Sequence, residues 1–438
     1  MPKVIIIGNG AREHVIAETL KNSTSNLDLF ILGEAKNPGL FSLASEYKIG
    51  KTTDLEVIRE FSTRIQPDFV IPGPEAPIDA GAVDLLLEMG IPSIAPIKTV
   101  ARLESSKSFT RDLLQKYGIQ GNPKFRVFFG NQGLESYLKN ELAEQFVIKA
   151  DGLQGGKGVK VVGDHLKNIE EGLNYAKECL NKDGRVVVEE KLLGQEFSLM
   201  SFTDGTTILD MIPVQDHKRA YVNDQGPNTG GMGSYSDANH LLPFLTPQDL
   251  AMANEITIQV SKALHKETKT PFKGIIYGGF IATKNGIKLI EYNARFGDPE
   301  AMNVLPLLKT NFIEICQALI KGELSGLKLE FKKQASVCKY VVPQGYPDNP
   351  TKNEKIELKS MPENAKAYFA SIDQRADGLY LMGSRAIALV GFGNSLPEAE
   401  QVAQKAALSI KGPVFFREDI GTEKLIKQKI KALQELRA

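Results

Sequence analysis

The first part of the sequence reads as a strand, a tight turn and a helix, an order typical of a parallel α/β sheet. Residues 3–7, KVIII, read as a buried-type strand, Gly-Asn-Gly follows, and residues 12–20 have the apolar spacing of a helix that packs on a sheet. Further apolar runs at residues 29–32 and 69–72 are separated by helix-like segments. Because parallel strands need such crossover helices, we expect residues 1–101 to form a small parallel α/β domain.

The first turn lacks one feature of a dinucleotide-binding turn. The third glycine of that fingerprint is replaced by Glu13, whose carboxylate would lie near a pyrophosphate, so NAD binding is disfavoured. The helix start near Gly10, with Arg12 beside it, still offers donors to a single phosphate. Residues 72–77 are rich in proline and are expected to form a rigid loop at the carboxyl end of a strand. Glu75 in that loop either holds ribose hydroxyls or is simply solvated.

Composition limits the class of protein. With 438 residues, 42% of them hydrophobic and 24% charged, the chain suits a soluble enzyme of about two to four domains. Lys plus Arg and Asp plus Glu both number 53, so net charge favours neither nucleic acid nor an anionic membrane. No apolar run approaches a membrane span and no signal-peptide pattern is seen, so we expect a cytoplasmic protein. The 3 widely spaced cysteines disfavour a disulfide framework and a zinc site.

A glycine-rich loop between two predicted strands is a candidate for polyphosphate binding. Residues 146–149 and 160–162 read as strands, and residues 152–158 contain four glycines. A backbone with so few side chains can approach phosphates closely, with Lys149 and Lys157 on its flanks. The spacing is not that of a Walker A loop, because GxxxxGK[ST] is absent and no helix follows. The alternative is a flexible surface hairpin without a ligand.

Two other segments add nucleotide contacts. Lys107 lies in the first turn of a predicted helix, where a positive charge is unfavourable unless an anion is bound. Residues 185–193 are predicted to form a strand whose end, beside Leu192, can pair with a purine edge. Glu196, just beyond, can accept hydrogen bonds from ribose hydroxyls.

The stretch IKLIEYNARFGDPEA, residues 287–301, is the candidate metal site. Ile287, Leu289, Glu291 and Asn293 alternate along it, and side chains two apart in a strand share a face. A carboxylate and an amide oxygen side by side suit Mg²⁺, which usually keeps substrate phosphates as further ligands. The alternative is a strand that ends in a Gly-Asp-Pro turn with solvated charges.

The remaining segments are a long loop and a last domain. Residues 215–233 contain QDHKR and GPNTGGMG, and ordered loops of this length are more often functional than not. Residues 335–342 and 385–390 are predicted strands, and an apolar stripe over residues 399–410 predicts a helix. Arg385 stands at the start of a predicted strand.

Taken in chain order, these motifs resemble the ATP-grasp superfamily and, within it, the glycinamide ribonucleotide synthetase family. The segments that carry the resemblance are GNGAREH, GPEAP, ESSKSFT, IKADGLQGGKGV, QDHKR, GPNTGGMGSYS and EYNARFGDPE. They span nearly the whole chain, and QDHKR to GGMG together with NARFGDPE is the most family-specific part. The sequence departs from the usual family pattern at Ala11, at Gln154-Gly155 and at Lys191.

The resemblance implies an α/β fold in three parts and a ligase activity. The parts are an N-terminal parallel α/β domain (1–101), a central ATP-grasp domain (102–326) with a mobile glycine-loop lid at about 122–190, and a small C-terminal α/β cap domain (327–438). The implied reaction of purine biosynthesis joins glycine to 5-phosphoribosylamine through glycyl phosphate, consuming ATP and using Mg²⁺ or Mn²⁺. We expect small-molecule partners only, with neither nucleic acid nor membrane, and a monomer or weak homodimer.

The resemblance also assigns roles to single residues. The metal is assigned to Glu291 and Asn293. The nucleotide is assigned to Lys107, Lys149, Gly155, Gly156, Lys157, Glu189, Lys191, Leu192 and Glu196. The catalytic contacts to glycyl phosphate are assigned to Lys218, Arg295 and Asp298. The phosphoribosyl acceptor is assigned to Gly10, Arg12, Glu75 and Arg385.

The sequence disfavours two other functions. A nucleotide-binding regulatory module would be expected to have lost the metal ligands or the lysines, and here all are present. Another ATP-grasp ligase or carboxylase acting on a small carboxylate, such as a biotin-carboxylase-like enzyme, is disfavoured by the QDHKR to GGMG block.

Overall fold

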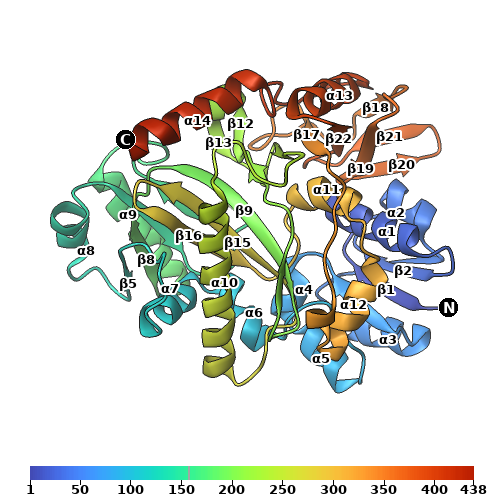
Figure 1. The fold of residues 1–438 in the computed structure, drawn as a ribbon, viewed down its shortest axis with the longest axis horizontal. Coiled ribbons are helices and arrows are strands. Elements are labelled where there is room, and N and C mark those ends of the chain that lie inside the picture. Colours follow the sequence, from blue (N-terminus) through green and yellow to red (C-terminus); the bar gives the residue numbers. More distant parts are fainter. Residues whose placement is uncertain (156–157) are drawn as a thin grey trace.

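The computed structural model describes residues 1–155 and 158–438 (Figure 1). The N-terminal part is a parallel four-stranded sheet in the order β3-β2-β1-β4, which confirms the predicted α/β domain. Its strands are β1 (Lys3–Ile7), β2 (Asp28–Gly33), β3 (Glu46–Ile49) and β4 (Phe69–Pro72). Its helices are α1 (Ala11–Ser23), α2 (Pro38–Leu43), α3 (Leu55–Ile65), α4 (Glu75–Ala80) and α5 (Ala82–Glu88).

The predicted rigid loop over residues 72–77 is wrong beyond Pro74. Pro74 is the N-cap of α4 with an extended backbone, and Glu75 is the first helical residue. Pro77 is tolerated there because the first N–H groups of a helix have no partner within it, so a proline loses nothing at that position.

The central part is built on an antiparallel sheet in the order β10-β9-β15-β16. Its strands are β9 (Gln195–Thr203), β10 (Ile208–Asp210), β15 (Gly274–Thr283) and β16 (Gly286–Asn293). The helices α6 (Lys98–Ser105), α7 (Lys107–Lys116), α10 (Pro247–Thr268), α11 (Glu300–Val304) and α12 (Phe312–Lys321) belong to this part of the chain. Thr246 and Asp249 form a capping box at the start of α10.

A smaller unit, at the left of Figure 1, has its own sheet and its own hydrophobic core. The sheet runs β5-β8-β6-β7, and α9 packs on β6 and β8. Its elements are β5 (Phe125–Phe128), α8 (Leu134–Ser136), β6 (Phe146–Ala150), β7 (Val159–Val161), α9 (Ile169–Asp183) and β8 (Val186–Glu190). The predicted strand over residues 185–193 therefore ends earlier, at Glu190, because the chain turns there toward β9.

The C-terminal sheets lie at the upper right of Figure 1. The larger one runs β11-β14-β17-β22-β19, with β24 beside β17, and the smaller one runs β20-β21-β18-β23. Strands of the larger sheet are β11 (Gln215–Asp216), β14 (Gly233–Ser236), β17 (Ala335–Pro343), β19 (Ala365–Phe369), β22 (Ile387–Gly393) and β24 (Val414–Phe415). The other strands are β18 (Lys355–Leu358), β20 (Ile372–Arg375), β21 (Gly378–Leu381) and β23 (Ile410–Lys411).

This larger sheet takes two strands, β11 and β14, from the middle of the chain. Between them lies a hairpin of β12 (Arg219–Tyr221) and β13 (Gln225–Asn228). The last helices are α13 (Leu396–Leu408) and α14 (Glu423–Arg437). Two predicted boundaries are corrected: Arg385 precedes β22 by two residues, and Ile410 leaves the helical stripe for β23, because the chain pairs there with β18.

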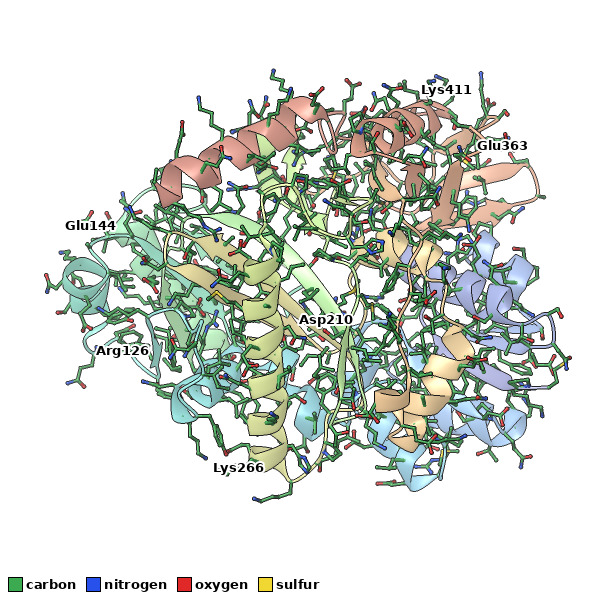
Figure 2. The ribbon with its side chains drawn as sticks, in the orientation of Figure 1. Arg126, Glu144, Asp210, Lys266, Glu363 and Lys411 are labelled. Carbon is green, nitrogen blue, oxygen red and sulfur yellow. The ribbon has the colours of Figure 1, made fainter. Side chains whose placement is uncertain are left out.

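Charged side chains lie at the rim of the molecule, as Lys266 and Lys411 show in Figure 2. In the part of the chain that the structure describes, no helix is both long and apolar enough to cross a membrane.

Candidate active site

A cavity of about 650 Å³ receives side chains from the N-terminal, central and C-terminal parts of the chain. The predicted site residues that line it are Arg12, Glu75, Lys107, Lys149, Gly155, Glu189, Glu196, Lys218, Glu291, Asn293, Arg295, Asp298 and Arg385. Gly10, Lys191 and Leu192 are not among its lining residues, and Gly156 and Lys157 lie outside the described residues. Motifs far apart in the sequence therefore meet in one place.

Glu291 and Asn293 reach this cavity because of a β-bulge. The predicted alternation, which put them on the face of Leu289, is wrong: the pairing of β16 with β15 shifts by one residue, and Ile290 is the extra one. The bulge reverses the phase of the strand, so Tyr292 joins Leu289 in the core. Glu291 and Asn293 then lie together on the cavity side.

The backbone carbonyl of Ile290, at the bulge, accepts hydrogen bonds from two buried cations. Ile290 O accepts hydrogen bonds from Arg111 Nη2 at 2.6 Å and from Lys149 Nζ at 3.1 Å. Arg111 also forms a bidentate ion pair with Glu189, with Nε 2.6 Å from Oε1 and Nη2 3.0 Å from Oε2. Lys149 Nζ lies 2.8 Å from Glu189 Oε2. Burial would raise the pKa of Glu189, but the Arg111 and Lys149 charges lower it. Lys149 is thus fixed at the cavity wall.

Arg111 was missed by the sequence analysis, and the role of Glu189 is broader than predicted. Arg111 lies one turn after Lys107 on α7, which was a weak signal that it faces the same site. Both oxygens of Glu189, a predicted adenosine contact, are engaged by cations. Lys107 Nζ donates to the carbonyl of Gly152 at 2.9 Å, and Ser106 caps α7 by accepting the N–H of Phe109.

Arg295 is held by two carboxylates and an amide. Glu104 Oε1 lies 3.0 Å from Arg295 Nη2, and Glu104 Oε2 accepts the N–H of Ala294 at 2.7 Å. Glu75 Oε2 lies 3.4 Å from Arg295 Nε, and Nη2 donates to Asn293 Oδ1 at 3.1 Å. Burial lowers the pKa of Arg295, but the charges of Glu104 and Glu75 raise it above its usual range. Glu104 also escaped the sequence analysis.

Lys218 and Glu291 face one another across the cavity. Lys218 Nζ lies 3.6 Å from Glu291 Oε1. Burial would raise the pKa of Glu291, but Lys218 and other nearby cations lower it to about 2. Asp216, two residues before Lys218, has a buried Oδ1 without a hydrogen-bond partner among the described residues. Burial and the charge of Glu300 raise the pKa of Asp216.

The C-terminal domain reaches the cavity through Arg385. Its Nη1 donates to the carbonyl of Gly230 at 2.7 Å and lies 3.1 Å from Asp298 Oδ1. The guanidinium stacks over Tyr340, 4.5 Å from the ring centroid, and the Tyr340 hydroxyl donates to Asp298 at 2.8 Å. Arg385 therefore holds the GGMG loop as well as lining the cavity.

The remaining predicted residues bind other parts of the protein. The N–H of Gly10 donates to Glu13 Oε2 at 2.5 Å, and Arg12 Nε donates to Glu13 Oε1 at 2.7 Å. The Glu13 carboxylate thus accepts two of the donors at this helix start, the Gly10 N–H and Arg12 Nε. Lys191 Nζ donates to the carbonyl of Val162 at 2.8 Å.

Three domain models of phosphoribosylglycinamide synthetase match the chain: the N domain over residues 2–104, the ATP-grasp (A) domain over 105–301 and the C domain over 336–423. A phosphoribosylamine–glycine ligase of Methanococcus vannielii is 47% identical over 444 residues, covering 99% of this chain and 100% of that protein.

The solved structures that this chain resembles include a ligase and a carboxylase domain. The phosphoribosylamine–glycine ligase of Thermotoga maritima has a TM-score of 0.80 and 28% identity, covering 95% of this chain and 99% of that one. The biotin carboxylase domain of Hydrogenobacter thermophilus 2-oxoglutarate carboxylase, in complex with MgADP, has a TM-score of 0.72 and 15% identity, covering 99% and 93%, and is alike in fold alone.

The buried charges predict a large effect on stability. Replacing Arg111 with Leu leaves Glu189 with Lys149 alone in a site where the arginine is 2% exposed, so the free energy of unfolding should fall by about 3 to 5 kcal/mol. Urea unfolding followed by circular dichroism measures this. The matched control is Arg64→Leu, which breaks an Arg–Glu pair of similar length between exposed side chains and should change little. If the free energy of unfolding falls equally in Arg111→Leu and Arg64→Leu, burial of the Arg111–Glu189 pair does not explain the loss of stability.

Proposed function

The chain belongs to the phosphoribosylglycinamide synthetase family, and from that membership we propose how its cavity serves an ATP-dependent ligase. The reaction joins glycine to 5-phosphoribosylamine, forms a C–N bond and gives glycinamide ribonucleotide, ADP and phosphate. The observation that supports this assignment most is that predicted site residues from all three parts of the chain, among them Arg12, Glu291 and Arg385, line the same cavity.

The chemistry requires activation before ligation. A carboxylate does not acylate an amine until one of its oxygens becomes a good leaving group. A glycine carboxylate oxygen therefore bonds to the γ-phosphorus of ATP while the bond from that phosphorus to the β,γ-bridging oxygen breaks. The amine of phosphoribosylamine then attacks the carbonyl carbon of glycyl phosphate, phosphate leaves and the nitrogen loses a proton. Positioning and fixed charges supply most of the rate enhancement.

Fixed cations bind the transferring phosphate in this proposal. Lys149 and Arg295 are held in place by buried carboxylates, so their charges need no rearrangement as negative charge develops on the phosphoryl oxygens. Lys218, Arg295 and Asp298 surround the glycyl phosphate, and the lid excludes water that would hydrolyse it. The residues proposed to bind the nucleotide are Lys107, Lys149, Gly155, Gly156, Lys157, Glu189, Lys191, Leu192 and Glu196.

A divalent metal ion, Mg²⁺ or Mn²⁺, is proposed to bind Glu291 and Asn293. The donor set fits a hard cation, because both side chains offer oxygen and the pKa of about 2 keeps Glu291 ionised at neutral pH. Since no cluster of three His, Cys, Asp or Glu side chains suited to a metal occurs among the described residues, phosphate oxygens would complete the shell. When bound, the ion neutralises phosphate charge.

The acceptor is proposed to bind between the N-terminal and C-terminal domains. Arg12, Glu75 and Arg385 line the cavity from those two sides, and Gly10 completes the proposed set. Charge-assisted hydrogen bonds from the arginines suit the phosphate of phosphoribosylamine.

An ADP-release assay tests the proposed function. We expect ADP to form steadily only when glycine and freshly made phosphoribosylamine are both present with ATP and Mg²⁺. Omission of either substrate is the control. ADP release that needs bicarbonate in place of glycine would instead support an ATP-grasp carboxylase.

Loss of a proposed metal ligand should reduce turnover without loss of the fold. Glu291→Ala or Asn293→Ala removes one of the two side-chain oxygen atoms that would hold the ion, so kcat should fall by at least about 10²-fold at modest Mg²⁺. Circular dichroism should be unchanged. Turnover close to that of the parent in both variants would exclude these residues as ligands.

Arg385→Ala separates acceptor binding from glycine activation. If Arg385 holds the phosphoribosyl group, kcat/KM for phosphoribosylamine should fall by about 10- to 100-fold, or about 1.4 to 2.7 kcal/mol. Hydroxylamine is small enough to attack glycyl phosphate without that pocket, so the variant should form glycine hydroxamate at the parent rate wherever the parent forms it.

The control for this experiment is Arg375→Ala, which alters an exposed arginine of the same domain and should affect neither assay. Parallel loss of hydroxamate and ligase activity in Arg385→Ala would assign Arg385 to the GGMG loop and the activation step instead, as its bond to Gly230 suggests.

A further inference from the structure

The hairpin that follows Lys218 turns at Asn223 and Asp224. Their φ angles of 59° and 54° lie in the left-handed region, which a tight hairpin turn requires at both central residues and which asparagine and aspartate adopt more readily than other residues with a side chain. The two turn residues also make contacts beyond the hairpin.

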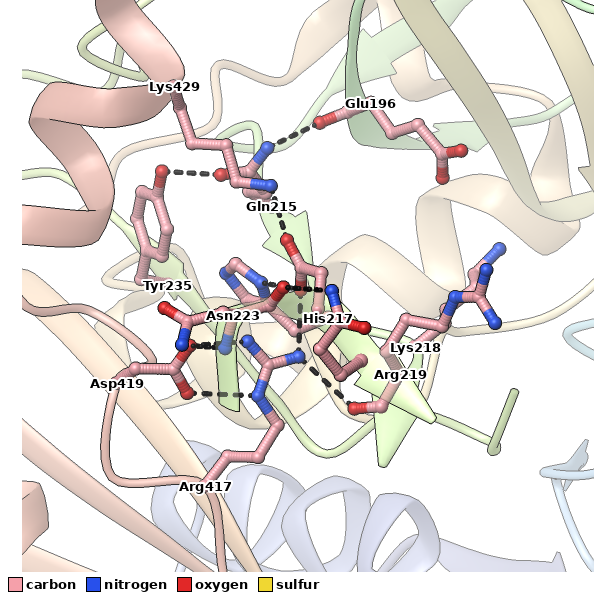
Figure 3. A network of polar contacts seen from close by, with 12 residues as sticks. Glu196, Gln215, His217, Lys218, Arg219, Asn223, Tyr235, Arg417, Asp419 and Lys429 are labelled. Atoms are coloured by element: carbon pink, nitrogen blue, oxygen red, sulfur yellow. Dashed lines mark hydrogen bonds and ion pairs between the residues drawn. The ribbon is translucent and has the colours of Figure 1, made fainter. Parts of the chain in front are cut away.

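These contacts come from α14 and from the C-terminal segment that leads into it (Figure 3). Asp419 Oδ2 accepts the N–H of Asn223 at 2.9 Å. The Asp224 carboxylate receives Arg417 Nη1 at 2.8 Å and Lys429 Nζ at 2.5 Å. Arg417 is itself fixed by Asp419, through Nε at 2.9 Å and Nη2 at 2.7 Å, and its side chain is 1% exposed. The turn is thus held by a directional network centred on the buried Arg417.

The same groups anchor the chain on both sides of Lys218. On one side, Arg417 Nη1 donates to the carbonyl of Arg219 at 3.1 Å. On the other, His217 Nδ1 lies 3.5 Å from Asp224 Oδ1. Lys218 is the residue between these two anchors, and its side chain lines the cavity, whose wall also includes Asp224 and Lys429 (Figure 3). The position of this lysine is therefore coupled to Arg417 and Asp224.

Docking of α14 does not explain the ion pair of Lys429. The inner face of the helix is buried through Leu425, Ile426 and Leu433. Its far end is fixed by Arg437, which binds Asp249 through Nη1 at 3.0 Å and Nη2 at 2.8 Å. Lys429 lies between these attachments, and its ammonium pairs with Asp224 of the hairpin at the wall of the cavity.

We propose that Arg417 and Lys429 are positioning residues for Lys218, so that the C-terminal domain serves the phosphorylation of glycine and not only the binding of the acceptor. The inference rests on the proposed function, in which Lys218 meets the phosphoryl group in transfer. The expected effect is large because a misplacement of about 1 Å can cost about 10²-fold in rate.

The test is Lys429→Met, which removes the charge but keeps the length of the side chain. Under saturating substrates kcat should fall by about 10- to 100-fold, while KM for phosphoribosylamine and the thermal midpoint stay unchanged. Arg417→Lys should show the same fall in kcat, because a lysine cannot bind Arg219 O, Asp224 and Asp419 at once, but with a lower thermal midpoint, since Arg417 is 1% exposed. Lys427→Met is the matched control, since Lys427 lies on the exposed face of α14, paired with Glu423, and should have no effect.

A rescue experiment separates positioning from a purely structural role. Ethylammonium added to Lys429→Ala should restore part of kcat if the missing charge positions Lys218, and a stability defect would not respond in this way. Parental kcat in Lys429→Met, a raised KM for phosphoribosylamine with unchanged kcat, or no rescue would each overturn the inference. A parent protein that releases no ADP with both substrates would overturn the proposed function instead, so the two failures are distinguishable.

Discussion

The β-bulge at Ile290 is the constraint on which the rest of the site depends. Without it, strict alternation would carry Glu291 and Asn293 to the core face of β16, where an unpaired carboxylate is costly to bury. With it, Tyr292 continues the core, and the carbonyl of Ile290 receives the Lys149 ammonium. One extra residue in one strand thus sets the oxygen atoms proposed for the metal and a cation proposed for the phosphates.

Ion pairs with buried carboxylates hold two cations of the cavity in place when no anion is bound. Lys149 is held by Glu189, and Arg295 by Glu104. A buried cation without a partner would be costly, so the carboxylates keep the site stable when no anion is bound. They also fix each cation in direction, and a fixed charge assists phosphoryl transfer more than one that must reorient during the reaction.

The sequence predicted what is local and missed what depends on distant partners. Strands such as β1 and β4 follow from short apolar runs, and the motif residues gather because the fold brings the ends of their elements together. Glu104 and Arg111 could not be found in this way, because their partners, Arg295 and Glu189, lie far along the chain. The bulge at Ile290 was hidden for another reason: it changes the phase of the strand without changing its composition.

The topology of the C-terminal sheet restricts which part of the molecule can move over a bound substrate. Because β11 is bonded through β14 to β17, the residues just before Lys218 belong to the same sheet as the C-terminal strands. Displacing that domain as a body would carry Lys218 away from Glu291. The sheet β5-β8-β6-β7 is different, since its hydrophobic core is separate from the main one. Lys149 and Glu189 tie one part of it to Ile290 and Arg111, so we expect the rest of the sheet to pivot about that attachment. Closure over the nucleotide is therefore expected in this sheet, with the C-terminal sheet as the fixed frame.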